Sequence, residues 1–456
     1  MTTTASDRRY VGAHRPQSSS TAEQPGAAPL SAEAAASFPH QCDPDTLPHR
    51  PFGQRRPASR LIGLDMARGI ALIGMIAVHT IEAGNRTGDM SLAWTLAAGK
   101  SAALFALLGG VGIALMTGRR VAPRGMDALR AAATPVVRGL LLVLIGLVLG
   151  GLVAYQDAAV VLAYLGAMFV LAGLLVPLRT RTLLVLGFGW AIASPVISHL
   201  LRQSMPPAEQ VNIGLGALAD PGSLLQTLVF TGTFPAFTWM AYICIGMAIG
   251  RCALTSRLVI AKILAGGVLL TLVTSVASSI LVDGFHLRQQ LADDVASGMS
   301  LSRFTDYLVF GADGTLPTTS WWWLGLMSPH TSTPLDLLHT IGTSLIVLGA
   351  CLALAQVFGT RFLLLAVPGS MTLTLYTLHV LALQPFRGFS DAVHFVVQVV
   401  LLCTFAIIWG RYFQQGPMER ALSTMSRALT PRRKSTPAQA SIPGGSAGAE
   451  TGHARG

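Results

Sequence analysis

The sequence is short of charged residues. Asp, Glu, Lys and Arg make up 12% of its 456 residues and hydrophobic residues make up 52%, whereas a soluble globular chain is roughly 25% charged. Much of the surface therefore does not face water. The formal net charge is +11, but the arginines lie in short segments between apolar runs and form no basic face on a soluble domain. This distribution argues against nucleic acid as a partner.

Metal-binding motifs are also missing. The five cysteines form no CxxC pair and have no metal-ligand spacing: Cys42, Cys244, Cys252, Cys351 and Cys403. All but Cys42 lie inside or just beyond apolar runs, where cysteine commonly serves as a small apolar side chain. We therefore expect no metal site. Lysine is scarce, and the excess of arginine over lysine indicates a GC-rich bacterial genome.

Long apolar runs dominate what is present. Ten of them approach the ~20 residues that a helix needs to cross ~30 Å of hydrocarbon. They cover residues 62–84, 94–117, 133–154, 158–178, 182–201, 224–250, 259–282, 334–357, 362–384 and 394–413. The sequence therefore predicts an all-α, polytopic transmembrane helical bundle of about ten spans, surrounded by the lipid bilayer of a bacterial inner (plasma) membrane.

Two polar tails flank the predicted membrane domain, residues 58–415. Residues 1–57 are rich in Ser, Ala, Pro, Gln and Arg without periodicity, and within the second tail, residues 416–456, the chain from about Arg432 onward is again rich in Pro, Gly, Ser and Ala. Such segments bury too little apolar surface to fold alone. We expect a disordered N-terminal tail and a mostly disordered C-terminal tail.

Basic residues distinguish the two sets of connections between the runs. Cytoplasmic loops carry an excess of Lys and Arg, so the more basic set, together with both tails, is predicted to be cytoplasmic. Trp321, Trp322 and Trp323 precede the eighth run and are expected in an aromatic belt at the outer interface. The basic set contains Arg119, Arg120, Arg124, Arg130, Arg179, Arg181, Arg251, Arg257, Lys262 and Arg361.

The first run carries ionisable residues on one helical face. Arg68 and His79 are eleven residues apart, three turns plus roughly 20°, and about 16 Å apart along the axis. Asp65 is placed to pair with Arg68, and Glu82 with His79. This stripe could line a polar path through the bilayer. The alternative is that Asp65 and Arg68 anchor the helix at the interface while His79 points outward.

The eighth run begins with a second polar cluster. Asp336 and His339 are three residues apart, so the carboxylate could orient the imidazole, and His330 lies just before them. The alternative is an aspartate that complements the helix dipole and a packed histidine. The predicted topology places His79, His330, His339 and the histidine of the ninth run in the outer half.

The ninth run places three polar residues on one face. Thr372, Tyr376 and His379 follow at i, i+4 and i+7, although hydroxyl groups at this spacing can also join neighbouring helices. In the second run, Lys100 is expected near the outer end, where it could bind an anionic group or extend to the interface. A neutral histidine at such a depth is a natural general base.

The stretch LDMARGIALIGMIAVH resembles the first helix of the transmembrane acyltransferase superfamily. This group includes the acyltransferase-3 family, the heparan-α-glucosaminide N-acetyltransferase family and the bacterial DUF418/YeiB-type proteins. Arg68 and His79 match the arginine, ten residues and histidine of the acyltransferase-3 signature. SAALFALLGGVGIALMTG and GSMTLTLYTLHV resemble helices of the other two branches. The heparan-type histidine in the loop after the first helix has no counterpart in residues 85–99.

The resemblance implies an integral membrane acyltransferase. By analogy it would use a cytosolic acyl-CoA, acetyl-CoA, as donor and an extracytoplasmic glycan or lipid of the cell envelope as acceptor. Arg68 would bind donor phosphates or hold the path with Asp65, and His79 would act as general base or nucleophile. Substrate orientation or proton relay would fall to Asp336, His339 and His379, and substrate binding to Lys100, His330 and Tyr376.

Two other functions remain open from the sequence. The same polar residues would suit a proton-coupled transporter or flippase, in which the histidines carry protons. A non-catalytic membrane component of an envelope assembly is the third hypothesis. A homo-oligomer is compatible with each of them.

Overall fold

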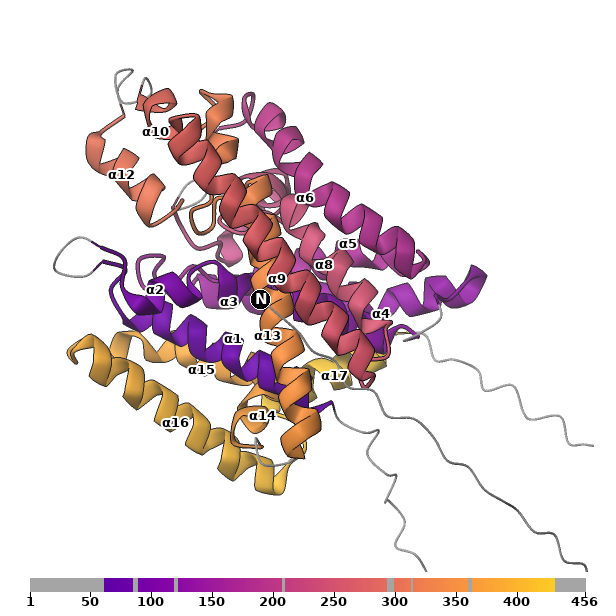
Figure 1. The fold of residues 1–456 in the computed structure, drawn as a ribbon. Helices are drawn as coiled ribbons and strands as arrows, with labels where there is room; N and C mark the ends of the chain where they lie inside the picture. The colour runs from indigo at the N-terminus through magenta and orange to yellow at the C-terminus, as the bar shows by residue number, and fades with distance from the viewer. Residues whose placement is uncertain are drawn as a thin grey trace, which may run out of the picture. The chain divides into compact units, whose positions relative to one another are not determined.

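The computed structural model describes residues 61–84, 89–118, 122–206, 210–292, 299–312, 315–359 and 363–430. Helices joined by turns and loops make up this part of the chain, and none of these residues belongs to a β-strand element (Figure 1). The prediction of an all-α fold is therefore confirmed. The predicted N-terminal tail lies outside the described residues.

Seven helices in the described part are long and apolar enough to cross a membrane. An eighth span would be the bent pair of α7–η3 (Pro221–Thr231) and α8 (Ala236–Gly250), which turns by 58°. The multi-pass prediction is supported, but the count of ten spans is not confirmed. The seven are α1 (Ile62–Thr80), α2–α3 (Leu92–Ala97 and Lys100–Met116), α4 (Gly125–Gly150), α6 (Thr180–Arg202), α9–η4 (Arg257–Ser279 and Ile280–Gly284), α13 (Pro334–Phe358) and α16 (Asp391–Tyr412).

Two of the predicted spans are short or interrupted helices. The run 158–178 forms only α5 (Leu162–Ala172) and the 3-10 turn η1 (Gly173–Leu175), and the run 362–384 is divided into α14 (Leu363–Gly369) and α15 (Thr372–Ala382). Pro368 lies in the last turn of α14. Proline has no backbone N–H and disfavours helix continuation. As a result α15 begins as a separate helix. A prediction based only on the length of an apolar run does not detect such a break.

Small residues bring the central helices close together. A Cβ on Gly246 of α8 would meet the carbonyl oxygen of Leu107 in α3, and a Cβ on Gly69 of α1 would lie 2.5 Å from the carbonyl oxygen of Leu365 in α14. Close backbone approach of this kind is how helices associate in a membrane, where no hydrophobic force drives them together. The first contact joins α8 to α3, and the second joins α1 to α14.

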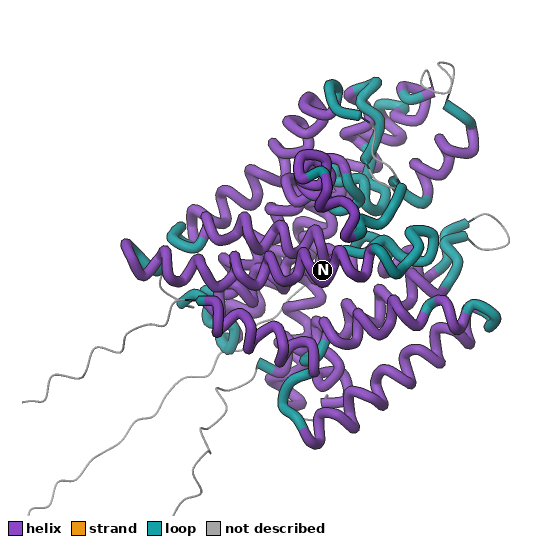
Figure 2. Tube along the Cα trace, turned by 180° about the vertical axis from the view of Figure 1, so that it is seen from behind, coloured by secondary structure: helices purple, strands orange, loops and turns teal. Residues whose placement is uncertain are grey.

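The segment between α9 and α13 has a small core of its own. α10 (Leu287–Gln290), α12 (Leu301–Val309) and η5 (Trp321–Gly325) contribute to a cluster around Trp323, which is 0% exposed. The predicted aromatic belt is therefore wrong for Trp323, whose ring packs edge-on against Tyr307 at 5.6 Å. Seen from behind, much of the loop structure gathers at one end of the bundle (Figure 2).

The C-terminal part of the bundle extends past the predicted domain boundary. Residues 417–429 form α17 (Pro417–Leu429), which contacts α4 and α15. The prediction that placed residues from 416 onward in a tail is corrected here, because Met418, Leu422, Met425 and Leu429 recur at helical spacing and Leu422 joins the core. Two short elements, η2 (Leu215–Ala219) and η7 (Gln384–Phe386), complete the described fold.

Candidate functional site

The two signature residues of α1 have partners of different kinds. Arg68 Nη1 donates to Asp65 Oδ1 at 3.1 Å, as the i, i+3 spacing predicts. The expected pair of His79 with Glu82 is not among the ion pairs of the described residues: Nδ1 of His79 lies 2.9 Å from Nε2 of His379 on α15. Glu82 is exposed. The stripe therefore combines an ion pair near its start with a histidine pair near its end.

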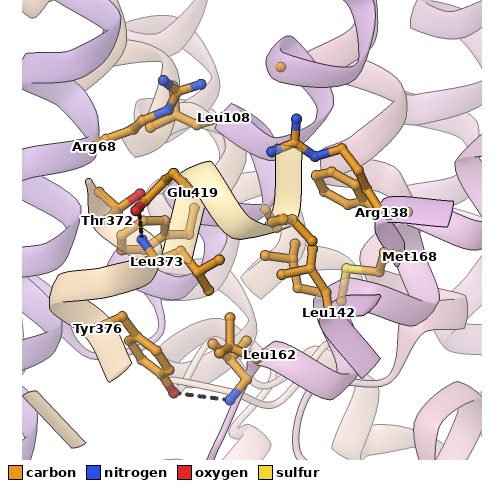
Figure 3. A pocket seen from close by; sticks show the side chains of 18 of the residues that line it. Arg68, Leu108, Arg138, Leu142, Leu162, Met168, Thr372, Leu373, Tyr376 and Glu419 are labelled. Atoms are coloured by element: carbon orange, nitrogen blue, oxygen red, sulfur yellow. Dashed lines mark hydrogen bonds between the residues drawn. The ribbon is translucent and has the colours of Figure 1, made fainter. Parts of the chain in front are cut away.

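Arg68 lines a cavity of about 400 Å³, here called the arginine cavity. Residues of α1, α3, α4, α5, α15 and α17 surround it, and most of its lining is apolar. Figure 3 shows the guanidinium groups of Arg68 and Arg138 in the upper part of the view, the Glu419 carboxylate below Arg68 where it accepts from the Leu373 N–H, and the Tyr376 hydroxyl at the lower end. The cavity thus combines cationic groups at one end with an apolar body.

His79 lines a second cavity of about 370 Å³, here called the histidine cavity. Its lining is more polar and includes His330, Glu82, Tyr155 and Asp157. Aromatic rings also face it, from Trp94, Phe234 and Phe310. A lining that combines aromatic rings with hydroxyl and carboxylate groups suits a ligand with both apolar and hydrogen-bonding faces.

The two cavities lie back to back along α1. Met75 and Ala102 are the two residues that line both of them. Met75 is one turn before His79 and is 5% exposed, and Ala102 is 6% exposed. A pair of apolar side chains from α1 and α3 therefore forms the partition between an arginine-bearing and a histidine-bearing compartment.

A chain of hydrogen bonds continues from His79 into α16. His379 Nδ1 lies 2.5 Å from Gln398 Oε1, and Gln398 Nε2 lies 2.8 Å from His394 Nε2. His379 is 0% exposed and Gln398 1%. The series His79, His379, Gln398 and His394, here called the histidine chain, links the histidine cavity to the buried face of α16.

Asp336 and His339 do not form the predicted pair. Asp336 Oδ2 accepts a hydrogen bond from the Ser332 backbone N–H at 2.9 Å, and His339 Nδ1 instead faces Thr274 Oγ1 on α9 at 3.2 Å. Neither residue lines the arginine or the histidine cavity. The carboxylate therefore accepts from the turn that precedes α13, near the N-terminus of that helix, as expected if Asp336 complements the helix dipole. We assign neither Asp336 nor His339 to the candidate site.

The other predicted binding residues divide between the two cavities and the surface. The Tyr376 hydroxyl accepts from the Val161 N–H at 3.2 Å and lines the arginine cavity. His330 lines the histidine cavity, its Nδ1 has no hydrogen-bond partner, and burial lowers its pKa to about 4. The ring is therefore neutral near pH 7. Lys100 Nζ donates to the Thr95 carbonyl at 2.5 Å and lines neither cavity.

Several residues of the two cavities and of the histidine chain escaped the sequence analysis. Arg138 is a cation inside an apolar run, and Gln398 and His394 are polar residues one turn apart in another. Each of these three residues could have been found from the sequence, because a polar or charged side chain inside an apolar run is energetically costly in a membrane. Glu419 was missed because it lies beyond the predicted domain boundary, and Asp157 sits in a connection with no recognisable motif.

The comparisons with known proteins agree with the predicted resemblance. Residues 60–276 match the family described as heparan-alpha-glucosaminide N-acetyltransferase, catalytic. The matched part includes Arg68, His79 and Arg138 but not His379, Gln398 or Glu419. No curated protein matches the chain. The apolar helices indicate a multi-pass membrane protein, and its residues 60–276 are similar to the catalytic part of this acetyltransferase family.

Proposed function

We propose that the protein is a membrane acyltransferase in which donor and acceptor occupy the two cavities. The donor would be acyl-CoA, acetyl-CoA in the simplest case, and the acceptor a hydroxyl or amine of an envelope glycan or lipid. The observation that carries the proposal is the meeting of the arginine and histidine cavities at Met75 and Ala102. Reactants entering from opposite sides would come together there.

The arginine cavity suits an anionic thioester donor. Guanidinium groups bind phosphate oxygens through several N–H donors at once. Arg138 has an Nε without a hydrogen-bond partner, and it makes no ion pair in the described part of the chain. The apolar walls would hold the pantetheine arm and direct the thioester towards the partition.

The histidine cavity suits an acceptor rich in hydroxyl groups. The Trp94 indole N–H and His330 Nδ1 are buried without a hydrogen-bond partner, and both residues line this cavity. Buried polar atoms normally find a partner, so these two would be satisfied by the acceptor or its water. Tyr155 and Asp157 offer further hydrogen-bonding groups.

The transfer step follows from the position of His79. Its ring would take the proton of the acceptor hydroxyl or amine while the oxygen or nitrogen attacks the thioester carbonyl. The new C–O or C–N bond forms and the C–S bond of the donor breaks. The CoA thiolate leaves as thiol after it receives a proton, which returns the histidine to its neutral state.

Substitution of His79 tests this assignment. In the purified full-length protein, His79→Ala is expected to lower acyl transfer from radiolabelled acetyl-CoA to a panel of amine and hydroxyl glycans by about 10²- to 10⁴-fold. His286→Asn is the matched control, because His286 is exposed with φ of 51°, a conformation that asparagine tolerates. Full activity of His79→Ala would show that the residue is not the base.

A transport assay separates this proposal from a proton-coupled carrier. The protein in proteoliposomes should release free CoA only when both acetyl-CoA and an acceptor are present. A solute flux that depends on a pH gradient and needs no acyl-CoA would instead support a transporter and contradict the acyltransferase.

A further inference from the structure

We propose that Gln398 is a positioning residue that fixes which nitrogen of His79 carries the proton, leaving a lone pair on Nε2 for the transfer step. The inference deepens the proposed function and rests on it for the role of His79. Its physical basis, however, lies in the histidine chain alone. Each hydrogen bond of that chain constrains the next.

The constraint begins at the side-chain amide. An amide oxygen can only accept a hydrogen bond and an amide nitrogen can only donate one. Gln398 Oε1 lies 2.5 Å from His379 Nδ1, so that nitrogen carries the hydrogen. Gln398 Nε2 lies 2.8 Å from His394 Nε2, which must then accept. In this arrangement the amide N–H groups face His394 and the amide oxygen faces His379.

The constraint then passes to His79. A neutral imidazole carries a hydrogen on only one of its two ring nitrogens. His379 is 0% exposed, and a charged ring is disfavoured at such a position. With the hydrogen on Nδ1, Nε2 of His379 offers a lone pair. His79 Nδ1, 2.9 Å away, must therefore donate, and the second nitrogen of a neutral His79 is left free.

The ring geometry agrees with this reading. The planes of the two imidazoles differ by 5° and their centroids are 5.2 Å apart. The facing nitrogens are much closer, at 2.9 Å, so the rings meet edge to edge rather than face to face. A hydrogen on His79 Nδ1 therefore points in the plane of both rings at the lone pair of His379.

The same chain would act during transfer. When His79 Nε2 takes a proton from the acceptor, the positive charge is shared with His379 through the existing hydrogen bond, and the Gln398 oxygen supports it. A second histidine thus does what a carboxylate does for many catalytic histidines, without placing a permanent negative charge in the membrane. A glutamine that only joined helices would have no influence on the protons of His79.

The test reads the protons of His79 directly. The protein has eleven histidines, and ¹⁵N-histidine labelling of the substrate-free full-length protein in nanodiscs gives ring-nitrogen shifts that distinguish the two neutral forms. The signal lost in His79→Gln is that of His79. We expect the wild type to carry the hydrogen on Nδ1, and Gln398→Leu to give a mixture of both forms.

Activity provides the second measurement. Gln398→Leu should lower kcat by about 10- to 100-fold, the size typical of losing the group that orients a histidine, with KM for acyl-CoA changed less than about threefold because the arginine cavity is untouched. Gln398→Glu keeps an oxygen acceptor for His379 and should retain the Nδ1–H form. Leu402→Met, one turn further along α16, is the control for a general change in packing.

Each outcome decides the proposal. A hydrogen on His79 Nε2 in the wild type would overturn it, and so would an unchanged spectrum in Gln398→Leu. If that variant does not fold, the wild-type and Gln398→Glu spectra still decide. The expected spectra in a protein without acyltransferase activity would leave the role of Gln398 standing and reject the proposed function.

Discussion

Met75 occupies the point where the reacting groups would have to meet. It is buried on α1, lines both cavities and shares the partition with Ala102. Methionine is flexible and fills irregular gaps, so it can move aside for a small acyl group and close again. The size of this side chain should therefore set the length of the acyl group that is transferred.

Shortening the partition should broaden the acyl specificity. We expect Met75→Ala to raise the ratio of kcat/KM for hexanoyl-CoA to kcat/KM for acetyl-CoA by about tenfold, because pocket discrimination of this kind is worth ~1–3 kcal/mol. Met66→Ala is the control: Met66 is equally buried on α1 but lines neither cavity. Its truncation should cost ~2–5 kcal/mol of stability and leave the ratio unchanged. A similar rise in both variants would contradict the role of Met75.

The sequence predicted a contact between site residues correctly where both partners lie on the same helix and no other helix offers a better partner. The Asp65–Arg68 pair follows from a spacing of three, and it forms. The pairs Asp336–His339 and His79–Glu82 have the same spacing, but neighbouring helices supply better partners, Thr274 for one histidine and His379 for the other. A spacing rule cannot weigh such partners, because they come from segments far apart in the chain.

Among the elements, α15 depends most on another part of the chain. It begins beside the break after α14, and Glu419 of α17 accepts hydrogen bonds from the Leu373 and Thr374 N–H groups at 2.7 and 3.2 Å and from Thr374 Oγ1 at 2.6 Å. A carboxylate at a helix N-terminus satisfies free donors and complements the dipole. α17 therefore holds the start of the helix that carries His379.

Removal of this carboxylate should loosen α15. Glu419→Ala is expected to lower the free energy of unfolding by about 1.5–3 kcal/mol, the range for hydrogen bonds to a charged group, as measured by thermal unfolding in detergent. Arg420→Ala, on the exposed face of the same helix, should change it by less than about 0.5 kcal/mol. Equal effects would mean that the contact of Glu419 with α15 is not what stabilises the helix.

The lengths of the apolar runs predicted most of the long helices but not the points at which helices are interrupted. Long uniform runs such as 334–357 became single helices, because the spanning length and the helical hydrogen bonds have the same requirement. The run 362–384 did not form one helix, and Pro368 lies beside the point where it is interrupted. A single proline changes the average hydropathy of a long apolar run very little, so an average over the run does not reveal the interruption.

At the scale of the whole molecule, the connections between the helices lie at two ends of the bundle, and a hydrogen bond joins connections at each end. Gln356 donates to the Thr255 carbonyl, joining the end of α13 to the start of α9, and Gln384 donates to Asp157 at the other end. The order of the helices along the chain assigns most of the cations of the described connections and of α17 to the first end, as expected for the predicted cytoplasmic side. These residues include Arg124, Arg130, Arg179, Arg181, Arg251, Arg257, Arg411, Arg420 and Arg427.

Single cysteines should reveal the orientation of the bundle. In a parent without the native cysteines, Ser302→Cys on α12, where Ser302 is exposed, should react with a membrane-impermeant maleimide on intact cells. α12 lies in the connection before the eighth run, the same connection that holds the tryptophans predicted at the outer interface. Thr424→Cys on exposed α17 should react only after the cells are permeabilised. The reverse pattern would place the basic end outside.

The partition formed by Met75 and Ala102 also has an electrical consequence. Polar groups approach it from both cavities, so along this path most of the membrane voltage would fall across two apolar side chains. Moving one elementary charge through 100 mV costs ~2.3 kcal/mol, and a wider opening would let ions run down that voltage. The residues at which the proposed reactants would meet would therefore also have to keep the membrane insulated.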